Sequence, residues 1–411
     1  MKEEHADFLF VSKLDDIMWF CNIRGNDVEC NPVALSYLFL TKKDIYLFVQ
    51  KEALSPCAAE YLSAGGVQIM EYADVFAFME KETVQLVGIA DAEETSYLAA
   101  SIIEKQGHIL QTGNPVEKIK AVKSQDEIER MRRFYLEDSA AVCKFIYYMK
   151  KHGAGMTEYE AAGYLDDLRA RIEGFKGLSF PTISAYGANA AMMHYEAKKN
   201  ECAVIEPKGL LLVDSGGQYL EGTTDITRTF ALGPVTEEMR SNFTRVLRSN
   251  LNLANAKFLY GCSGINLDVL ARQPLWEANL DYKHGTGHGV GHVLNVHEGP
   301  NGFHWGRKGY AAALEEGMIT TDEPGIYIEG GYGIRLENEL VCRKGEKNAY
   351  GQFMYFENLT FVPFDLDAVD ASQMNETEKG YLNAYHKAVY EKIAPRLTTE
   401  EAEWLKEYTR S

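Results

Sequence analysis

The chain has 411 residues, of which 46% are apolar and 25% charged. This composition is typical of globular proteins, and it excludes a mainly disordered, collagen-like or low-complexity chain. Lys and Arg number 42 and Asp and Glu 60, which gives a formal charge of −18. An acidic balance disfavours nucleic-acid binding, because that needs clustered basic side chains. From the length we expect two domains, or three, at roughly 150 residues each.

Several features bear on the compartment. The sequence contains no apolar run of about 18 residues, the length that spans a membrane. The charged start, residues 1–5, is not followed by an apolar segment and a cleavage site, so we expect no secretory signal. The seven cysteines are scattered and never spaced as CxxC, which favours reduced, buried thiols over a disulfide framework or a zinc site. These features predict a cytoplasmic protein without a membrane partner.

The first part of the chain alternates short apolar runs with helical spacing. We expect strands over residues 7–11, 45–49 and 87–90, and helices over 52–63 and 96–106. This order predicts an α/β unit, and it contains no cluster of catalytic residue types. The turn-forming segment Thr112–Pro115 marks its end. The expected domains are therefore 1–115 and 116–411.

The second domain is expected to begin with a long amphipathic helix. From about Ser124 to Met149, apolar residues recur at three- and four-residue spacing, which gives one buried stripe. The next helix starts at Thr157, where Thr157 and Glu160 match a capping box. Later helices are expected from about Thr236, over 376–392 and over 399–408. Strand-like segments between and after these helices hold the residues that suggest chemistry.

Two aspartates stand at the ends of strand-like segments. The apolar run 210–213 ends at Asp214, and Asp225 follows after a Gly- and Tyr-rich turn. A carboxylate at the end of a buried strand costs on the order of several kcal/mol unless a cation or hydrogen-bond donors meet it. An antiparallel hairpin would bring the two carboxylates side by side. For this pair alone, a turn Asp214 and a surface Asp225 paired with Arg228 is the favoured interpretation.

A histidine cluster changes that interpretation. His284, His288, His292 and His297 lie within fourteen residues and are interleaved with glycines. Core packing does not explain this pattern. Glycine lets the backbone approach closely, and imidazoles suit borderline metals or proton transfer. The cluster therefore indicates a functional site.

Two glutamates complete the set of candidate residues. Glu323 ends a strand-like segment against a Pro-Gly turn. Alternation would place Glu337 on one strand face with Arg335 and Glu339. An ion pair between Glu337 and Arg335 on an exposed strand is the alternative, but the surrounding residues indicate a buried strand: Ile334, Leu336, Leu340 and Val341.

Together these residues have the composition of a two-metal site. Two Asp, two Glu and one His are what two adjacent divalent cations need, because four carboxylates balance a charge of +4. The predominance of oxygen ligands favours manganese or cobalt over a closed thiolate zinc site.

Six motifs resemble those of the pita-bread metallopeptidases: Asp214-Ser-Gly-Gly-Gln-Tyr, Gly222-Thr-Thr-Asp225-Ile-Thr-Arg-Thr, His284-Gly-Thr-Gly-His288-Gly-Val-Gly, Leu294-Asn-Val-His297-Glu-Gly-Pro, Asp322-Glu323-Pro-Gly and Gly333-Ile-Arg-Leu-Glu337-Asn. Within this family the chain most resembles the cytosolic Xaa-Pro aminopeptidases (aminopeptidase P), including the N-terminal stretch 14–28. The resemblance implies an α+β fold, with a creatinase-like α/β domain over 1–115 and a pita-bread catalytic domain over 116–411. It also implies that the first domain of the longer, three-domain members is missing.

The resemblance further implies a ligand set for two divalent metal ions. Manganese is favoured, with cobalt or zinc as alternatives. Asp225 and Glu337 would bridge the metals, while His288 and Glu323 complete one metal and Asp214 the other.

The same resemblance implies roles around the substrate. His194, His284, His297 and Arg335 would bind it, with Glu323, His297 and His194 taking part in catalysis. His292 has no matching family ligand and is expected to be structural. The implied reaction is hydrolysis of the bond between an N-terminal residue and a following proline, so the partners would be peptides with proline at position two. A homodimer through the catalytic domain is also expected.

Three alternatives remain open. A proline dipeptidase on the same scaffold would need a feature that captures the carboxylate of a dipeptide. A catalytically silent peptide- or partner-binding protein, or a metal-free creatinase-like hydrolase, would be expected to have substituted ligands. All five ligand positions are filled here, which disfavours the last two.

Overall fold

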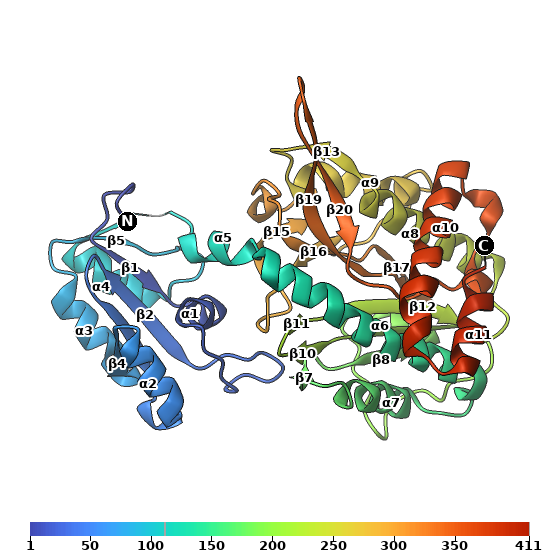
Figure 1. Cartoon of the computed structure of the whole chain (residues 1–411), viewed down its shortest axis with the longest axis horizontal. Coiled ribbons are helices and arrows are strands. Elements are labelled where there is room, and N and C mark those ends of the chain that lie inside the picture. Colours follow the sequence, from blue (N-terminus) through green and yellow to red (C-terminus); the bar gives the residue numbers. More distant parts are fainter. Residues whose placement is uncertain (111, 411) are drawn as a thin grey trace. The chain divides into compact units, whose positions relative to one another are not determined.

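A computed structural model describes residues 1–110 and 112–410 of the chain. Its contacts divide the chain into two compact units, Met1–Lys120 and Ala121–Ser411 (Figure 1). The expected boundary after residue 115 precedes this division. Most of helix α5 (Pro115–Ala121) belongs to the first unit, because the buried Lys120 ammonium forms ion pairs with Asp15 and Asp16 there. Among the helices of the described residues, none combines the length and the apolar character needed to cross a membrane.

The first unit is built on a six-stranded mixed sheet in the order β4-β3-β2-β1-β5-β6. Its strands are β1 (Phe8–Val11), β2 (Ser36–Thr41), β3 (Ile45–Val49), β4 (Val67–Glu71), β5 (Val87–Ile89) and β6 (His108–Leu110). Its helices, besides α5, are α1 (Leu14–Cys21), α2 (Pro56–Ala64), α3 (Val75–Glu82) and α4 (Tyr97–Gln106). The expected strands β1, β3 and β5 and helices α2 and α4 are confirmed. The α/β character of this unit is confirmed with them.

The second unit contains the helices that the spacing predicted. They are α6 (Gln125–His152), α7 (Glu158–Ala170), α8 (Glu237–Ala254), α10 (Glu376–Ile393) and α11 (Thr399–Tyr408). The expected capping box at the start of α7 is present, since the Thr157 hydroxyl accepts from the Glu160 N–H and the Glu160 carboxylate accepts from the Thr157 N–H. Helix α9 (Gly264–Trp276) was not expected. Its Pro274 is a poor helix residue, which hides the helix from sequence reasoning.

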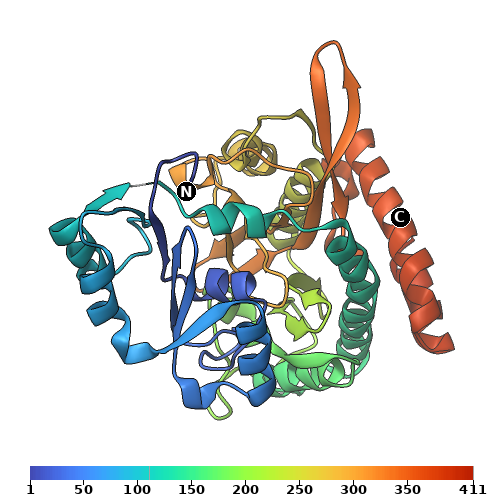
Figure 2. The same cartoon turned by 60° about the vertical axis from the view of Figure 1, so that its left-hand side comes forward.

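The strands of the second unit form several small sheets and one larger sheet. β8 (Ile183–Tyr186), β9 (Leu210–Ser215) and β12 (Ile226–Ala231) pair in the order β12-β9-β8. β7 (Phe175–Leu178), β10 (Gly217–Tyr219) and β11 (Gly222–Thr223) pair beside them, and β17 (Gly325–Ile328) pairs with β18 (Tyr332–Arg335). The larger sheet contains β13 (Lys257–Leu259), β14 (Gly287–Gly289), β15 (Glu298–Phe303), β16 (Ile319–Asp322), β19 (Asn338–Asn348) and β20 (Gly351–Asn358). The β19–β20 hairpin projects from this unit in both views (Figures 1 and 2).

One buried cation ties the strands of this unit to the segment before the C-terminal helices. Arg228, on β12, is 1% exposed, and its guanidinium donates to the Val362 carbonyl (2.7 Å), the Asn338 side chain (2.7 Å) and the Tyr385 hydroxyl (2.9 Å). These partners satisfy a charge that burial alone would make costly. The expected alternative of an Arg228–Asp225 surface pair is therefore wrong.

A buried histidine on α10 predicts how stability depends on pH. His386 is 0% exposed, and its Nε2 accepts from the Phe364 N–H (3.1 Å). Burial and the nearby Arg228 lower the pKa of His386 to about 3. The unfolded chain takes up this proton near pH 6.5 and the folded chain only near pH 3. Stability should therefore fall as the pH drops through this window, by about 1.4 kcal/mol for each pH unit.

Urea unfolding of the second unit at several pH values tests this prediction. His386→Gln should remove this one-proton share of the pH dependence between about pH 6.5 and 3, and His152→Gln, at the exposed end of α6, is the control. Identical slopes for wild type and His386→Gln would contradict it.

Candidate metal centre

Strands β9 and β12 bring two aspartates into the interior. The strands are antiparallel, and Asp214 lies opposite Thr227. Asp214 is 9% exposed, and Asp225, directly before β12, is 4% exposed. The expected antiparallel pairing is confirmed. Asp225 is no surface residue, because it is buried and its backbone N–H donates to the buried Glu339 carboxylate (2.7 Å).

The two glutamates stand where strands end. Glu323 follows β16, and its N–H donates to the Thr286 carbonyl (2.7 Å). Glu337 lies between the end of β18 and the start of β19, so the expected continuous strand face is wrong here. Thr227 fixes this break: its carbonyl accepts from the Glu337 N–H (3.0 Å), and its hydroxyl donates to Glu337 Oε2 (2.8 Å).

Arg335 pairs with an aspartate instead of Glu337. Its guanidinium donates to Asp214 Oδ2 (2.6 Å) and to the Tyr327 hydroxyl (2.8 Å). The alternative of an exposed Arg335–Glu337 ion pair is therefore wrong, since Arg335 is 4% exposed and pairs with Asp214. Asp214 Oδ2 is thus bound by Arg335, whereas Asp214 Oδ1 accepts no hydrogen bond from the described residues.

His288 presents one ring nitrogen to the carboxylates. Its Nδ1 lies 2.9 Å from the Gly289 carbonyl, which only accepts, so Nδ1 carries a proton and Nε2 is the nitrogen available to bind a metal. Nε2 lies 3.5 Å from Asp225 Oδ2 and 3.4 Å from Glu323 Oε1. An imidazole nitrogen and two carboxylates that face one another form a donor set that a cation can stabilise.

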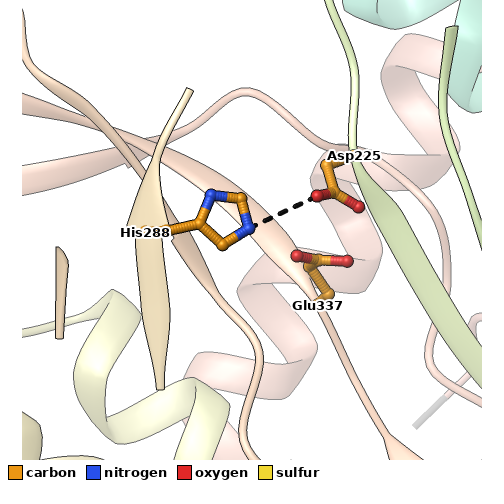
Figure 3. Close-up of side chains that lie close together, drawn as sticks. All are labelled: Asp225, His288 and Glu337. Carbon is orange, nitrogen blue, oxygen red and sulfur yellow. Dashed lines mark ion pairs between the residues drawn. The ribbon is translucent and has the colours of Figure 1, made fainter. Parts of the chain in front are cut away.

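The donor atoms converge. One ligand atom each from Asp225, His288 and Glu337 lie within 4.8 Å of one another, and Figure 3 shows these side chains pointing toward a common point. Asp214 Oδ1 and Glu337 Oε1 are buried without a hydrogen-bond partner among the residues that the structure describes. Burial and the neighbouring carboxylates raise the pKa of Asp225 and Glu337 well above the usual range. The donor set therefore fits divalent cations, because positive charge would satisfy the free oxygens and offset the repulsion.

The expected substrate residues lie around this cluster. The His297 ring centroid is 4.3 Å from that of His288. His284 is close to Tyr327, with ring centroids 5.4 Å apart, and burial and the Arg335 charge lower the pKa of His284 to about 3. Desolvation and the His288 imidazole lower the pKa of His297 to about 4, and the charge of His194 contributes to both shifts. The structure thus places the three imidazoles in one region, and the two with lowered pKa values are neutral at pH 7.

Sequence reasoning missed three residues of the site. Thr227 holds Glu337, Tyr327 accepts from Arg335, and Tyr135 on α6 donates to Glu339, which in turn accepts from the Asp225 N–H. Alternation in the sequence places Glu339 on the same strand face as Glu337 but does not indicate what Glu339 does. No local signal marks Tyr135, because its partner lies 204 residues away along the chain.

Models of known families match almost the whole chain. The model of metallopeptidase family M24 matches residues 129–344, and that of its C-terminal region matches 352–411. The creatinase/prolidase N-terminal domain matches residues 1–127. The chain belongs to metallopeptidase family M24. The expected order of a creatinase-like domain and a pita-bread domain in an α+β fold is thereby confirmed.

Relatives of this M24 chain support a closer comparison. It is 36% identical over 423 residues to a probable Xaa-Pro aminopeptidase P of Laccaria bicolor, covering 99% of this chain and 65% of that protein. It is 38% identical over 420 residues to a protein of the same name from Arthroderma gypseum, covering 98% and 66%. The chain thus spans about two thirds of the length of these curated relatives.

A solved structure is also similar to this M24 chain. It is the X-prolyl aminopeptidase of Caenorhabditis elegans, described as a cytosolic enzyme with a di-nuclear active site. The TM-score is 0.93 at 36% identity, and the match covers 100% of this chain and 68% of that chain.

Metal analysis tests the cluster directly. Asp225→Asn should lower the bound metal below the two equivalents expected for the wild type, because one carboxylate leaves the buried donor set. The fold should be retained, since the amide is isosteric. Elemental analysis after dialysis against manganese measures the metal, and thermal unfolding checks the fold. Glu221→Gln, an exposed change in the turn of the same hairpin, is the control. Two equivalents bound to Asp225→Asn would show that Asp225 is not a ligand.

Proposed function

We propose that this chain is a dinuclear-metal aminopeptidase that hydrolyses the bond between an N-terminal residue and a following proline. The observation that carries the proposal is the buried convergence of Asp225, His288 and Glu337 beside two further carboxylates. The names of the relatives support the same activity.

In this proposal five residues would hold two divalent cations. Asp225 and Glu337 would serve as ligands to both, His288 and Glu323 would complete the set for one, and Asp214 the set for the other. The unpartnered oxygens of Asp214 and Glu337 support these roles. Manganese is the proposed metal, because four of the five ligands supply oxygen; cobalt and zinc are the alternatives.

When bound, the two cations would polarise the scissile carbonyl and make water a stronger nucleophile at neutral pH. The Glu323 carboxylate faces the cluster beside His288, where it would take up the proton of the attacking water and deliver it to the leaving nitrogen of proline. His297 is neutral at pH 7 and would donate a hydrogen bond to the substrate. His284 is also neutral, but its Nδ1–H faces the Gly285 carbonyl (2.7 Å), so its Nε2 would accept a hydrogen bond from the substrate. Arg335 keeps Asp214 oriented through their 2.6 Å contact. His194 and Arg335 would complete the substrate site.

The proposal extends to partners and compartment. Peptides with proline at position two would be the substrates, with no nucleic-acid or membrane partner, in keeping with the charge of −18. A cytoplasmic location is supported by the description of the Caenorhabditis elegans relative as cytosolic. A homodimer through the catalytic unit is part of the same proposal.

The substrate assignment has a direct test. The amide nitrogen of a proline carries no hydrogen, so a site for Xaa-Pro bonds must accept the ring and needs no N–H at that position. Gly-Pro-X tripeptides should be cleaved faster than Gly-Ala-X tripeptides, and faster than the dipeptide Gly-Pro. Release of glycine by the manganese-loaded chain measures all three. Equal rates for Gly-Pro-X and Gly-Ala-X would contradict the proline assignment, and cleavage of the dipeptide alone would identify a proline dipeptidase.

The role of His297 is tested separately. His297→Ala should slow turnover by about 10²–10³-fold, as expected for loss of a hydrogen-bond donor to the developing charge. Bound manganese and the unfolding temperature should stay near wild-type values. His108→Ala, an exposed change in the first unit, is the control. If His297→Ala loses one equivalent of metal, His297 is a ligand, and the role given to His288 must change.

A further inference from the structure

A buried carboxylate outside the metal cluster gathers an unusual set of donors. Glu158, the first residue of α7, is 0% exposed. Its carboxylate accepts from four groups: the Tyr186 N–H (2.6 Å), the Asn189 side-chain amide (3.0 Å), the Tyr195 hydroxyl (2.7 Å) and the Ala203 N–H (2.8 Å). Hydrogen bonds to an ionised acceptor are about twice as strong as neutral ones. Neutral donors therefore stabilise this charge in place of a basic side chain.

All four donors belong to one segment, residues 186–203. The segment starts at the end of β8, passes through the short helix η3 (Gly187–Ala191) and contains His194. Its far end is also tied by backbone bonds, since the Glu158 N–H donates to the Ala203 carbonyl (3.0 Å) and the Ile205 N–H to Met156 (2.8 Å). The Glu158 carboxylate therefore connects Ala203, at the end of the segment, with Tyr186 and Asn189, which precede His194.

Tyr195 links the carboxylate to the neighbouring His194. Its hydroxyl donates to Glu158 and accepts from Asn189 (3.1 Å). Its ring packs against a buried cluster: Ile183, Ala185, Ala190 and Leu212. Leu212 lies on β9, two residues before Asp214. The residue next to His194 is thus fixed both to α7 and to a strand that carries a metal-ligand candidate.

His194 itself is exposed, yet it lies close enough to His284 and His297 for its charge to act on both. An exposed side chain on a long segment keeps such a position only if the backbone beside it is held. We propose that Glu158 is a positioning residue that holds His194 at the substrate site through Tyr195. This inference rests on the proposed function for the role of His194 as a substrate contact.

A purely structural role for Glu158 makes a different prediction. If Glu158 only stabilised the junction of α7 and β8, its loss would act on activity independently of His194. If it acts through His194, its loss should have little effect once His194 is absent. A double-mutant cycle separates these two cases.

The variants are Glu158→Gln, Tyr195→Phe and His194→Ala, together with Glu158→Gln combined with His194→Ala. Glu160→Gln is the matched control, because Glu160 is an exposed glutamate in the same helical turn. Kinetics on Gly-Pro-X use the manganese-loaded full chain. Glu158→Gln should lower kcat/KM by about tenfold, mainly through KM, and Tyr195→Phe should act in the same direction. Bound manganese should be unchanged, and Glu160→Gln should match the wild type.

In the His194→Ala background, Glu158→Gln should cost less than about twofold further. If the double variant loses kcat/KM by the product of the two single-variant factors, the proposal is overturned. Tyr195→Phe, combined with His194→Ala in the same way, decides the question if Glu158→Gln does not fold.

Hydrogen exchange of the metal-free chain gives a readout that does not depend on activity. Glu158→Gln should speed exchange of the amides in 186–203, and Glu160→Gln should not. Unchanged exchange would overturn the proposal. If the wild type binds manganese but cleaves no Xaa-Pro peptide, the proposed function fails, and exchange alone decides whether Glu158 holds the segment.

Discussion

The second unit is organised around the repulsion among carboxylates that its strands bring into the interior. Asp225 and Glu337 are almost fully buried, and burial together with the Asp214 and Glu323 carboxylates raises the pKa of both. Such a cluster persists only where the surrounding backbone is held firmly enough to prevent the side chains from separating. Thr227 and Arg335 supply part of that restraint, because each binds one carboxylate of the cluster directly. The antiparallel pairing of β9 with β12 supplies the rest.

A second restraint acts from behind the cluster. The Arg228 guanidinium donates to the backbone carbonyls of Thr227 and Glu337, and so links β12 to the strand break at Glu337. The same cation reaches the Val362 carbonyl and the Tyr385 hydroxyl, which connects the strand break at Glu337 to α10. The buried Arg228 cation thus stabilises the backbone next to the carboxylate cluster through hydrogen bonds to carbonyl groups. It does so without an ion pair to any of these carboxylates.

Local signals in the sequence predicted most of the helices and the identity of the candidate residues. The capping box at Thr157 and the apolar stripe of α6 are encoded within a few residues, so spacing alone reveals them. Asp214 was recognisable because a charge follows a wholly apolar strand. The strand break at Glu337 and the Asp214–Arg335 contact were not recognisable, since the contact joins residues 121 positions apart and alternation favoured a continuous strand. Helix α9 was hidden by Pro274, whose cost is offset by tertiary packing.

The candidate ligands lie on β9 and β14, directly before β12, directly after β16 and between β18 and β19. Cations bound to all of them would connect segments of the folded protein that are distant in the chain. Binding to the folded state alone would add stability that grows with the logarithm of free metal concentration. Chelation would therefore loosen several strands together, so the metal-free chain should become susceptible to proteolysis across the whole centre of the second unit at once.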